Sequence, residues 1–331
     1  MKLGQFGNTR LSVTPIGLGL AALGRPGYIN IGHAEDLQEE YAVEEMEERT
    51  HIVLDAAWAA GVRYFDAARS YGRAEAFLGS WLTSRSIPST SVVVGSKWGY
   101  TYTAGWQVEA DKHEVKDHSL SVLTRQIQES RNILGNYLNI YQVHSATRDS
   151  GILENMEVLK FLAELRNQGL IIGLSLSGPN QADTLLAAME LEFDGDPLFR
   201  SVQATWNLLS TDAGPALADA HQAGMGVIIK EALANGRLTD RNDEPAFESK
   251  KELLSKVAEE LNTTIDALAL SAAIAQPWSD VVLSGAARAD HLLSNLKATD
   301  IEWNMELEQQ FAPIVESPQT YWDIRSNLEW N

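Results

Sequence analysis

The chain has 331 residues, no cysteine and a net charge of −19 at pH 7. This acidity disfavours nucleic-acid binding, and the missing thiols exclude both a disulfide scaffold and a zinc–thiolate site. No stretch approaches the roughly 18 uncharged apolar residues of a membrane span, and the first residues lack the apolar core of a secretory signal. We therefore expect a cytoplasmic protein that binds neither nucleic acid nor membranes. Composition leaves the oligomeric state open.

Short apolar runs alternate with longer segments of helical periodicity along the whole chain. The first segment, residues 2–13, predicts a β-hairpin that turns at Gly7–Asn8. The expected strands cover residues 14–20, 62–67, 91–97, 138–144, 170–176, 200–206, 226–232 and 280–286. The expected helices cover residues 47–61, 74–84, 118–135, 152–169, 181–191, 214–224, 249–263, 264–276, 289–298 and 304–315.

This pattern of eight strand-then-helix units predicts a single (β/α)₈ barrel domain over residues 1–331. The strands are nearly all apolar, as in a parallel sheet that is buried on both faces. The N-terminal hairpin is expected to plug the barrel, and a C-terminal helix and tail complete it. A doubly wound open sheet is the alternative, but no GxGxxG follows a strand, and "GLGLAALG" (17–24) has the wrong spacing.

Polar side chains end three consecutive strands of the predicted barrel. Asp66 ends the second strand, with Tyr71 in the following loop, while Lys97 and His144 end the third and fourth. The carboxyl ends of barrel strands form the active-site face, so these side chains should meet. A lysine beside the tyrosine would lower the pKa of the phenol, and an aspartate would hold the lysine. The set therefore predicts a proton donor aimed at a carbonyl oxygen.

Other chemistries fit the residues less well. No HxH or HExxH pair occurs for a metal site, and no GxSxG elbow for a serine hydrolase. A glycosidase-like hydrolase would use two strand-end carboxylates, for which Asp66 and Glu231 are conceivable. That alternative leaves Tyr71 and Lys97 without a role.

The sequence as a whole resembles a known family. The stretches "GVRYFDAARSYGRAE", "VVVGSKWG", "LNIYQVHSA", "IIGLSLSGP" and "SVQATWNLL", in this order, look like those of the aldo-keto reductases. The resemblance spans essentially the full length. It implies that Tyr71 is the general acid–base, that Lys97 and Asp66 tune it, and that His144 orients the carbonyl or relays the proton. It also implies a nicotinamide cofactor stretched across the barrel mouth.

The resemblance extends to cofactor positions. Its implied contacts are Gly19 and Asp66, then Ser175 and Gln203 at the nicotinamide amide, Leu233 to Gly236 around the pyrophosphate, and Gly285, Arg288, His291 and Asn295 near the adenosine. Arg288 is the natural partner of a 2′-phosphate, which favours NADP over NAD. The pattern departs from the family at Lys230, which stands where an aromatic ring would stack on the nicotinamide.

The substrate pocket is expected to be lined by aromatic residues of the loops. Tyr28, Trp98, Ser145 and Trp206 are the candidates, and the insertion over residues 24–45 is a candidate lid. The predicted activity is hydride transfer between a nicotinamide cofactor and an aldehyde or ketone. A catalytically weak, cofactor-binding regulatory subunit of the same fold is the alternative.

Overall fold

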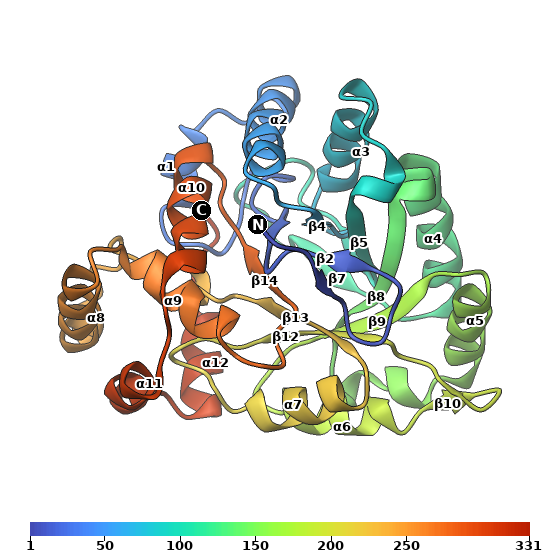
Figure 1. Cartoon of the computed structure of the whole chain (residues 1–331). Coiled ribbons are helices and arrows are strands. Elements are labelled where there is room, and N and C mark those ends of the chain that lie inside the picture. The colour runs from blue at the N-terminus through green and yellow to red at the C-terminus, as the bar shows by residue number, and fades with distance from the viewer.

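Eight parallel strands close into a barrel in the computed structural model, which describes residues 1–331 (Figure 1). In chain order they are β3 (Ile16–Gly19), β4 (Tyr64–Asp66), β5 (Val93–Trp98), β8 (Leu138–Ala146), β9 (Ile171–Leu176), β12 (Ser201–Thr205), β13 (Gly226–Lys230) and β14 (Val281–Ser284). Strand β14 pairs with β3, which closes the ring. The predicted (β/α)₈ barrel is therefore confirmed, and all eight strands lie within the expected ranges or extend them by one or two residues.

A small hairpin covers one end of the barrel. Strands β1 (Gly4–Gln5) and β2 (Ser12–Val13) pair antiparallel, and the Phe6 side chain between them is fully buried. Phe6 packs in a cluster with Tyr64, Val93 and Ile228 from the barrel interior. A Cβ added at Gly226 would lie 2.4 Å from the Phe6 ring, so this glycine makes room for the plug.

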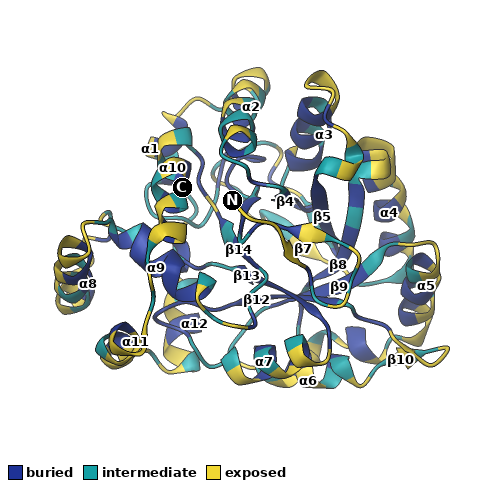
Figure 2. Ribbon diagram, viewed as in Figure 1, coloured by how far each residue is buried: buried dark blue, intermediate teal, exposed yellow.

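Helices surround the barrel, and Figure 2 shows them buried on the inner face and exposed on the outer. They are α1 (His33–Leu37), α2 (Val43–Ala59), α3 (Ala74–Ser84), α4 (Leu120–Leu134), α5 (Met156–Asn167), α6 (Gln181–Met189), α7 (Gly214–Gln222), α8 (Glu248–Glu260), α9 (Ile265–Ile274), α10 (Ala289–Leu296), α11 (Met305–Phe311) and α12 (Pro318–Ser326). Several begin at a side-chain cap: Ser119 accepts from the Val122 N–H and Thr264 from the Ala267 N–H. None of these helices has the length and apolarity that crossing a membrane requires.

Four further features are absent from the sequence-based expectation. Helix α1 interrupts the insertion after β3, the hairpin of β6 (Tyr100–Tyr102) and β7 (Glu114–Lys116) follows β5, and α12 follows α11. Residues of these three features line the main cavity of the molecule. The fourth is the small hairpin of β10 (Glu192–Phe193) and β11 (Asp196–Pro197) before β12. These elements have only a few residues or mixed polarity, so no apolar period marks them.

Candidate active site

A buried ion pair lies between the ends of β4 and β5. The Lys97 ammonium donates to the Asp66 carboxylate and also to the Ala67 carbonyl oxygen at 2.9 Å. The other carboxylate oxygen of Asp66 accepts from Gln203 Nε2 at 2.9 Å and from the Tyr64 hydroxyl at 3.3 Å. Lys97 is fully buried. A charge at such a depth needs this full set of partners, since burying it unpaired is costly.

The loop after β4 places the ring of Tyr71 next to the ammonium of Lys97. The Arg69 N–H bonds to the Lys97 carbonyl at 3.0 Å, and the Arg73 N–H to the Gly24 carbonyl at 2.7 Å. Gly72 adopts a positive φ of 57°, and a Cβ there would lie 2.4 Å from the Gly24 oxygen. A glycine after the tyrosine is thus required both by the turn and by the close approach of the two loops.

Tyr71 and His144 face one another beside the ion pair. Their ring centroids are 5.5 Å apart in an edge-on arrangement, and Lys97 Nζ lies 4.7 Å from the Tyr71 ring centroid. His144 Nδ1 is 3.3 Å from the Ser70 hydroxyl oxygen, which fixes the orientation of the imidazole. The strand-end residues Asp66, Lys97 and His144 and the loop residue Tyr71 are thus brought together, as their order on the strands predicts.

The electrostatics differ from the expectation in one respect. Burial, and then the charge of Asp66, raise the pKa of the Tyr71 phenol well above its usual value, with Arg25 opposing them. The sequence-based expectation of a lowered pKa was wrong, because burial of the phenol is the dominant effect and the negative charge of Asp66, the ion-pair partner of Lys97, adds to it. Burial, followed by the charges of Lys97 and Arg25, lowers the pKa of His144 well below its usual value. At neutral pH the site therefore holds a protonated phenol and a neutral imidazole.

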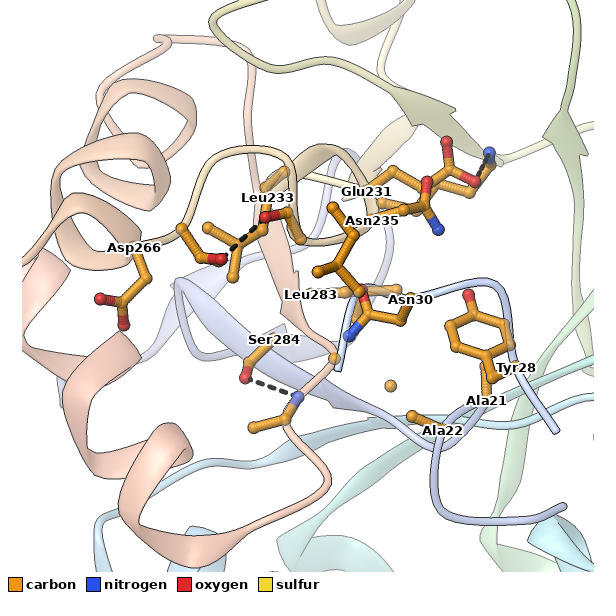
Figure 3. A pocket seen from close by; sticks show the side chains of 18 of the residues that line it. Ala21, Ala22, Tyr28, Asn30, Glu231, Leu233, Asn235, Asp266, Leu283 and Ser284 are labelled. Atoms are coloured by element: carbon orange, nitrogen blue, oxygen red, sulfur yellow. Dashed lines mark hydrogen bonds and ion pairs between the residues drawn. The ribbon is translucent and has the colours of Figure 1, made fainter. Parts of the chain in front are cut away.

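These side chains open onto one large cavity of about 780 Å³. Figure 3 shows Tyr28 with Ala21 and Ala22 at one side of the cavity and Asp266 at the other, with Leu233 and Asn235 on a loop between them. The volume is within the range of pockets that bury small-molecule ligands and cofactors. Asp66, Tyr71 and His144 line the same cavity, so a ligand bound there would contact them.

Most residues expected to bind a cofactor line this cavity. They are Gly19, Asp66, Gln203, Lys230, Leu233, Gly236, Gly285, His291 and Asn295. Asn235 also lines it, and its buried side-chain oxygen has no hydrogen-bond partner in the protein. Such an orphaned acceptor on a cavity wall fits a ligand that donates a hydrogen bond there.

Two of the expected cofactor residues do not line the cavity. The Ser175 hydroxyl oxygen accepts a hydrogen bond of 2.9 Å from the backbone N–H of Ser145, which does line the cavity. Arg288 forms two hydrogen bonds to the Asp290 carboxylate, at 3.0 and 2.8 Å, and lies off the cavity. Ser175 thus supports the cavity wall at Ser145, while Arg288 is engaged elsewhere.

Two of the four residues expected in the substrate pocket line the cavity, and two do not. Tyr28 and Ser145 line the cavity. Trp98 and Trp206 do not, because each directly follows an inward-pointing residue of its strand and alternation turns it outward. Trp98 packs edge-on against His118, and Trp206 against Trp278.

The comparisons with known proteins agree with this geometry. The model of the Aldo/keto reductase family matches residues 15–315. The chain belongs to the aldo-keto reductase family. A solved aldo-keto reductase of Bacillus halodurans in its holo form has the same fold, with a TM-score of 0.72, 20% identity, and coverage of 96% of this chain and 97% of that one.

Curated relatives are similar along most of the chain. The uncharacterized oxidoreductase YqkF of Bacillus subtilis is 23% identical over 321 residues, covering 91% of this chain and 92% of the relative. A Schizosaccharomyces pombe protein, provisionally named an aryl-alcohol dehydrogenase, is 25% identical over 350 residues, with 94% and 96% covered. Pyridoxal 4-dehydrogenase of Microbacterium luteolum is 27% identical over 272 residues, with 73% and 74% covered. As an aldo-keto reductase, the chain is an oxidoreductase by family.

This aldo-keto reductase has a second ionic cluster on the wall of the same cavity. Lys230 donates to the Thr205 hydroxyl at 2.7 Å and lies 3.6 Å from Glu231, which Arg325 of α12 grips at 2.6 and 3.1 Å. Burial, opposed by the charge of Glu231, lowers the pKa of Lys230 to about 8. Burial would raise the pKa of Glu231, but Arg325 and Lys230 outweigh it and lower the pKa to about 2. Both candidate carboxylates of the hydrolase alternative are held in ion pairs, Asp66 with Lys97 and Glu231 with Arg325, so neither is placed as the protonated acid that such a hydrolase needs.

Three residues at this end of the cavity were not predicted from the sequence. Arg25, Glu114 and Arg325 belong to the three features that carry no apolar period: the insertion, the β6–β7 hairpin and α12. A charged residue in a segment without a regular period looks like a solvated loop residue. The one available signal was the clustering of Tyr and Trp in the same segments.

Proposed function

We propose that this aldo-keto reductase transfers hydride between a nicotinamide cofactor and an aldehyde or ketone, with Tyr71 as the general acid–base. The observation that carries the proposal is that Tyr71, His144 and Asp66 line one cavity of about 780 Å³, with Lys97 paired to Asp66 directly behind them. The bound cofactor would supply the hydride. The residues of the chain would then provide the proton and hold the carbonyl.

Each residue has a role that its surroundings support. Tyr71 is protonated at neutral pH and therefore gives a proton to the carbonyl oxygen during reduction. Lys97 lies 4.7 Å from the Tyr71 ring and stabilises the negative charge that develops on the phenolate. Ser70 contacts Nδ1 of the neutral His144 ring. When Nδ1 accepts from the Ser70 hydroxyl, the Nε2–H group is free to donate a hydrogen bond to the carbonyl oxygen of the substrate. Asp66 keeps Lys97 in place.

The preferred dinucleotide is a separate part of the proposal. The sequence favours NADP through Arg288, but Arg288 is paired with Asp290 and lies off the cavity. The carboxylate of Asp266 lies at the side of the cavity remote from Tyr28, and Glu259 also lines the cavity. Arg241, an arginine of the cavity wall, is paired with Asp36. In Rossmann domains an acidic residue hydrogen-bonds the free 2′-hydroxyl of NAD, whereas a 2′-phosphate would be repelled. The acidic lining at this side of the cavity and the pairing of Arg288 with Asp290 support NAD(H) as the preferred cofactor.

An aromatic carbonyl compound is the substrate class we propose. The name of the fission-yeast relative points to aryl alcohols and that of the Microbacterium luteolum relative to pyridoxal. The rings of Tyr28, Tyr71 and Trp330 line the cavity of this chain and would pack against an aromatic substrate.

A fluorescence titration with NADH and NADPH in parallel tests the cofactor, and Tyr71→Phe tests the mechanism. We expect tighter binding of NADH. Arg288→Met should leave NADH binding unchanged; if NADPH binds more tightly and this variant abolishes that advantage, the sequence-based expectation of NADP is correct. Tyr71→Phe should lower carbonyl reduction by about 10²- to 10⁴-fold while cofactor binding is retained. Undiminished turnover would exclude Tyr71 as the proton donor.

The same assays address the alternative of a regulatory subunit. Such a protein would bind the dinucleotide but reduce every tested carbonyl slowly, and Tyr71→Phe would then change little. No observation on the site favours it, because the four proton-transfer residues are all present and in contact or near contact.

A further inference from the structure

Arg25 occupies an unusual place on the cavity wall. Its side chain is only 4% exposed, and its guanidinium carbon lies 5.3 Å from the ring centroids of both Tyr71 and Tyr28 and 4.8 Å from that of Trp330. It lines the same cavity as Tyr71 and His144. A permanent cation is therefore held among aromatic rings next to the proposed proton donor.

Only one of the three nitrogens of Arg25 is engaged. Nη1 donates to the Ser70 carbonyl at 3.1 Å and to Glu114 Oε2 at 2.9 Å. Nε is buried and has no hydrogen-bond partner. Both hydrogen bonds of the guanidinium to the protein run through Nη1, so none runs through Nη2. The Nε–Nη2 edge is the side of the fork that grips a carboxylate through two parallel bonds. Buried donors without a partner are rare, so this edge calls for an acceptor from outside the chain.

The balance of charge around the site points the same way. Lys97 pairs with Asp66, Arg25 with Glu114, and Lys230 and Arg325 share Glu231. Four cations thus face three carboxylates, which leaves this end of the cavity positive within a protein of net charge −19. An anionic group is attracted here although the protein as a whole repels anions.

We propose that Arg25 recognises the substrate, and that the substrate is a carbonyl compound carrying a carboxylate, which the Nε–Nη2 edge of Arg25 receives. The inference rests on the proposed function, since it names the substrate class of the same site. The aromatic rings around Arg25 accommodate an aryl or other flat apolar body between the carbonyl and the carboxylate. Arg25 lies in the insertion after β3, so this segment sets specificity.

Matched pairs of probes separate charge from shape. The kinetic pair is 3- or 4-carboxybenzaldehyde against its neutral methyl ester. The equilibrium pair is benzoate against benzamide, titrated calorimetrically into the full chain, which needs no turnover. We expect the wild type to prefer the anionic member of each pair. In Arg25→Gln the anion-to-neutral ratio should fall by about 10- to 100-fold, the loss typical of hydrogen bonds to a charged group.

Two further variants keep the test decisive. Glu114→Gln removes the carboxylate that competes for Arg25 and leaves Arg25 present, so benzoate should bind several-fold more tightly. Lys230→Gln removes the surplus positive charge but leaves Arg25 in place, so it should lower the ratio much less than Arg25→Gln does. The proposal is overturned if the wild type shows no preference for the anion, if Arg25→Gln weakens both members equally, if Glu114→Gln weakens benzoate, or if Lys230→Gln lowers the ratio as much as Arg25→Gln.

The outcome is independent of whether the protein is an active reductase. If no dinucleotide binds and no carbonyl is reduced, the proposed function fails, but the benzoate-to-benzamide ratio still reports on Arg25. If carbonyls are reduced without regard to their charge, the proposed function stands and the role of Arg25 fails.

Discussion

Lys97 and Asp66 form a fully buried ion pair whose two members come from neighbouring strands, β5 and β4. The ammonium is further bonded to the Ala67 carbonyl, and the carboxylate to Gln203 and Tyr64. The ammonium of Lys97 and both carboxylate oxygens of Asp66 therefore all have hydrogen-bond partners. The pair holds Lys97 next to the Tyr71 ring, so the stability of the fold and the arrangement of the candidate active site depend on the same two residues.

Removal of one partner of this pair should destabilise the protein strongly. Asp66→Asn leaves the Lys97 ammonium buried without a counter-charge, and we expect a loss of about 3–5 kcal/mol in the free energy of unfolding. The double variant Asp66→Asn/Lys97→Met buries no charge and should recover much of that loss. Urea denaturation of the wild type, both single variants and the double variant measures the coupling. Additive losses would show that the two charges do not stabilise one another.

The Glu231–Arg325 contact should make stability depend on pH in the acid range. The folded pKa of Glu231, about 2, lies below its usual 4.5. Its contribution, roughly 3 kcal/mol, is therefore fully present above pH 4.5 and is lost as the pH falls toward 2. We expect the stability difference between the wild type and Glu231→Gln to shrink by about 2 kcal/mol from pH 5.5 to pH 3.

Arg325→Gln is the matched control for this pH effect. It removes the main charge that lowers the Glu231 pKa, so the acid dependence attributed to Glu231 should largely disappear in this background. A dependence that persists unchanged would assign it to another acidic group, such as Asp36, whose pKa is also lowered.

The barrel and the residues of its candidate active site could be predicted from the sequence for a physical reason. A strand buried on both faces must be a continuous apolar run, so a charged residue at its end, such as Asp66 or Lys97, stands out. The parallel barrel then brings all strand ends to one face, which places Asp66, Lys97 and His144 together without knowledge of any loop. The order of residues and the closure of the sheet were therefore sufficient for the proton-transfer site.

The loop segments that line the cavity could not be predicted from the sequence by the same argument. Specific ion pairs tie down the insertion with Arg25, the β6–β7 hairpin with Glu114 and α12 with Arg325. The apolar side chains that these segments bury, such as Leu37 and Tyr321, are too few to form a regular period. The pairing of the charged side chains on these segments depends on the folded arrangement and cannot be derived from their order in the sequence. The misplacement of Trp98 has a different cause: the sequence marks it as aromatic, but alternation along β5 turns it away from the cavity.

The plug at the other end of the barrel gives a test that does not involve the active site. The Gly226→Ala methyl group would lie 2.4 Å from the Phe6 ring, so we expect a loss of about 1–3 kcal/mol from overpacking. Phe6→Ala should cost about 3–5 kcal/mol by itself, because it empties a buried aromatic site. In the Phe6→Ala background, Gly226→Ala should cost much less than in the wild type. Equal costs in both backgrounds would show that Phe6 does not occupy this space.

Lys230 should make cofactor binding depend on pH in the alkaline range. It lines the cavity, and burial lowers its pKa to about 8, while the pKa of His144 is lowered and that of Tyr71 raised, so neither of these titrates there. If its ammonium contacts the pyrophosphate, the affinity for NADH should be constant below about pH 8 and fall above it as the ammonium loses its proton. Fluorescence titrations at pH 7, 8, 9 and 9.5 measure this decline. Lys230→Arg keeps the charge at every pH and should bind NADH with little change over the series, whereas Lys230→Met should bind weakly throughout. A decline of the same size in all three proteins would place the titrating group elsewhere and leave Lys230 with only a packing role.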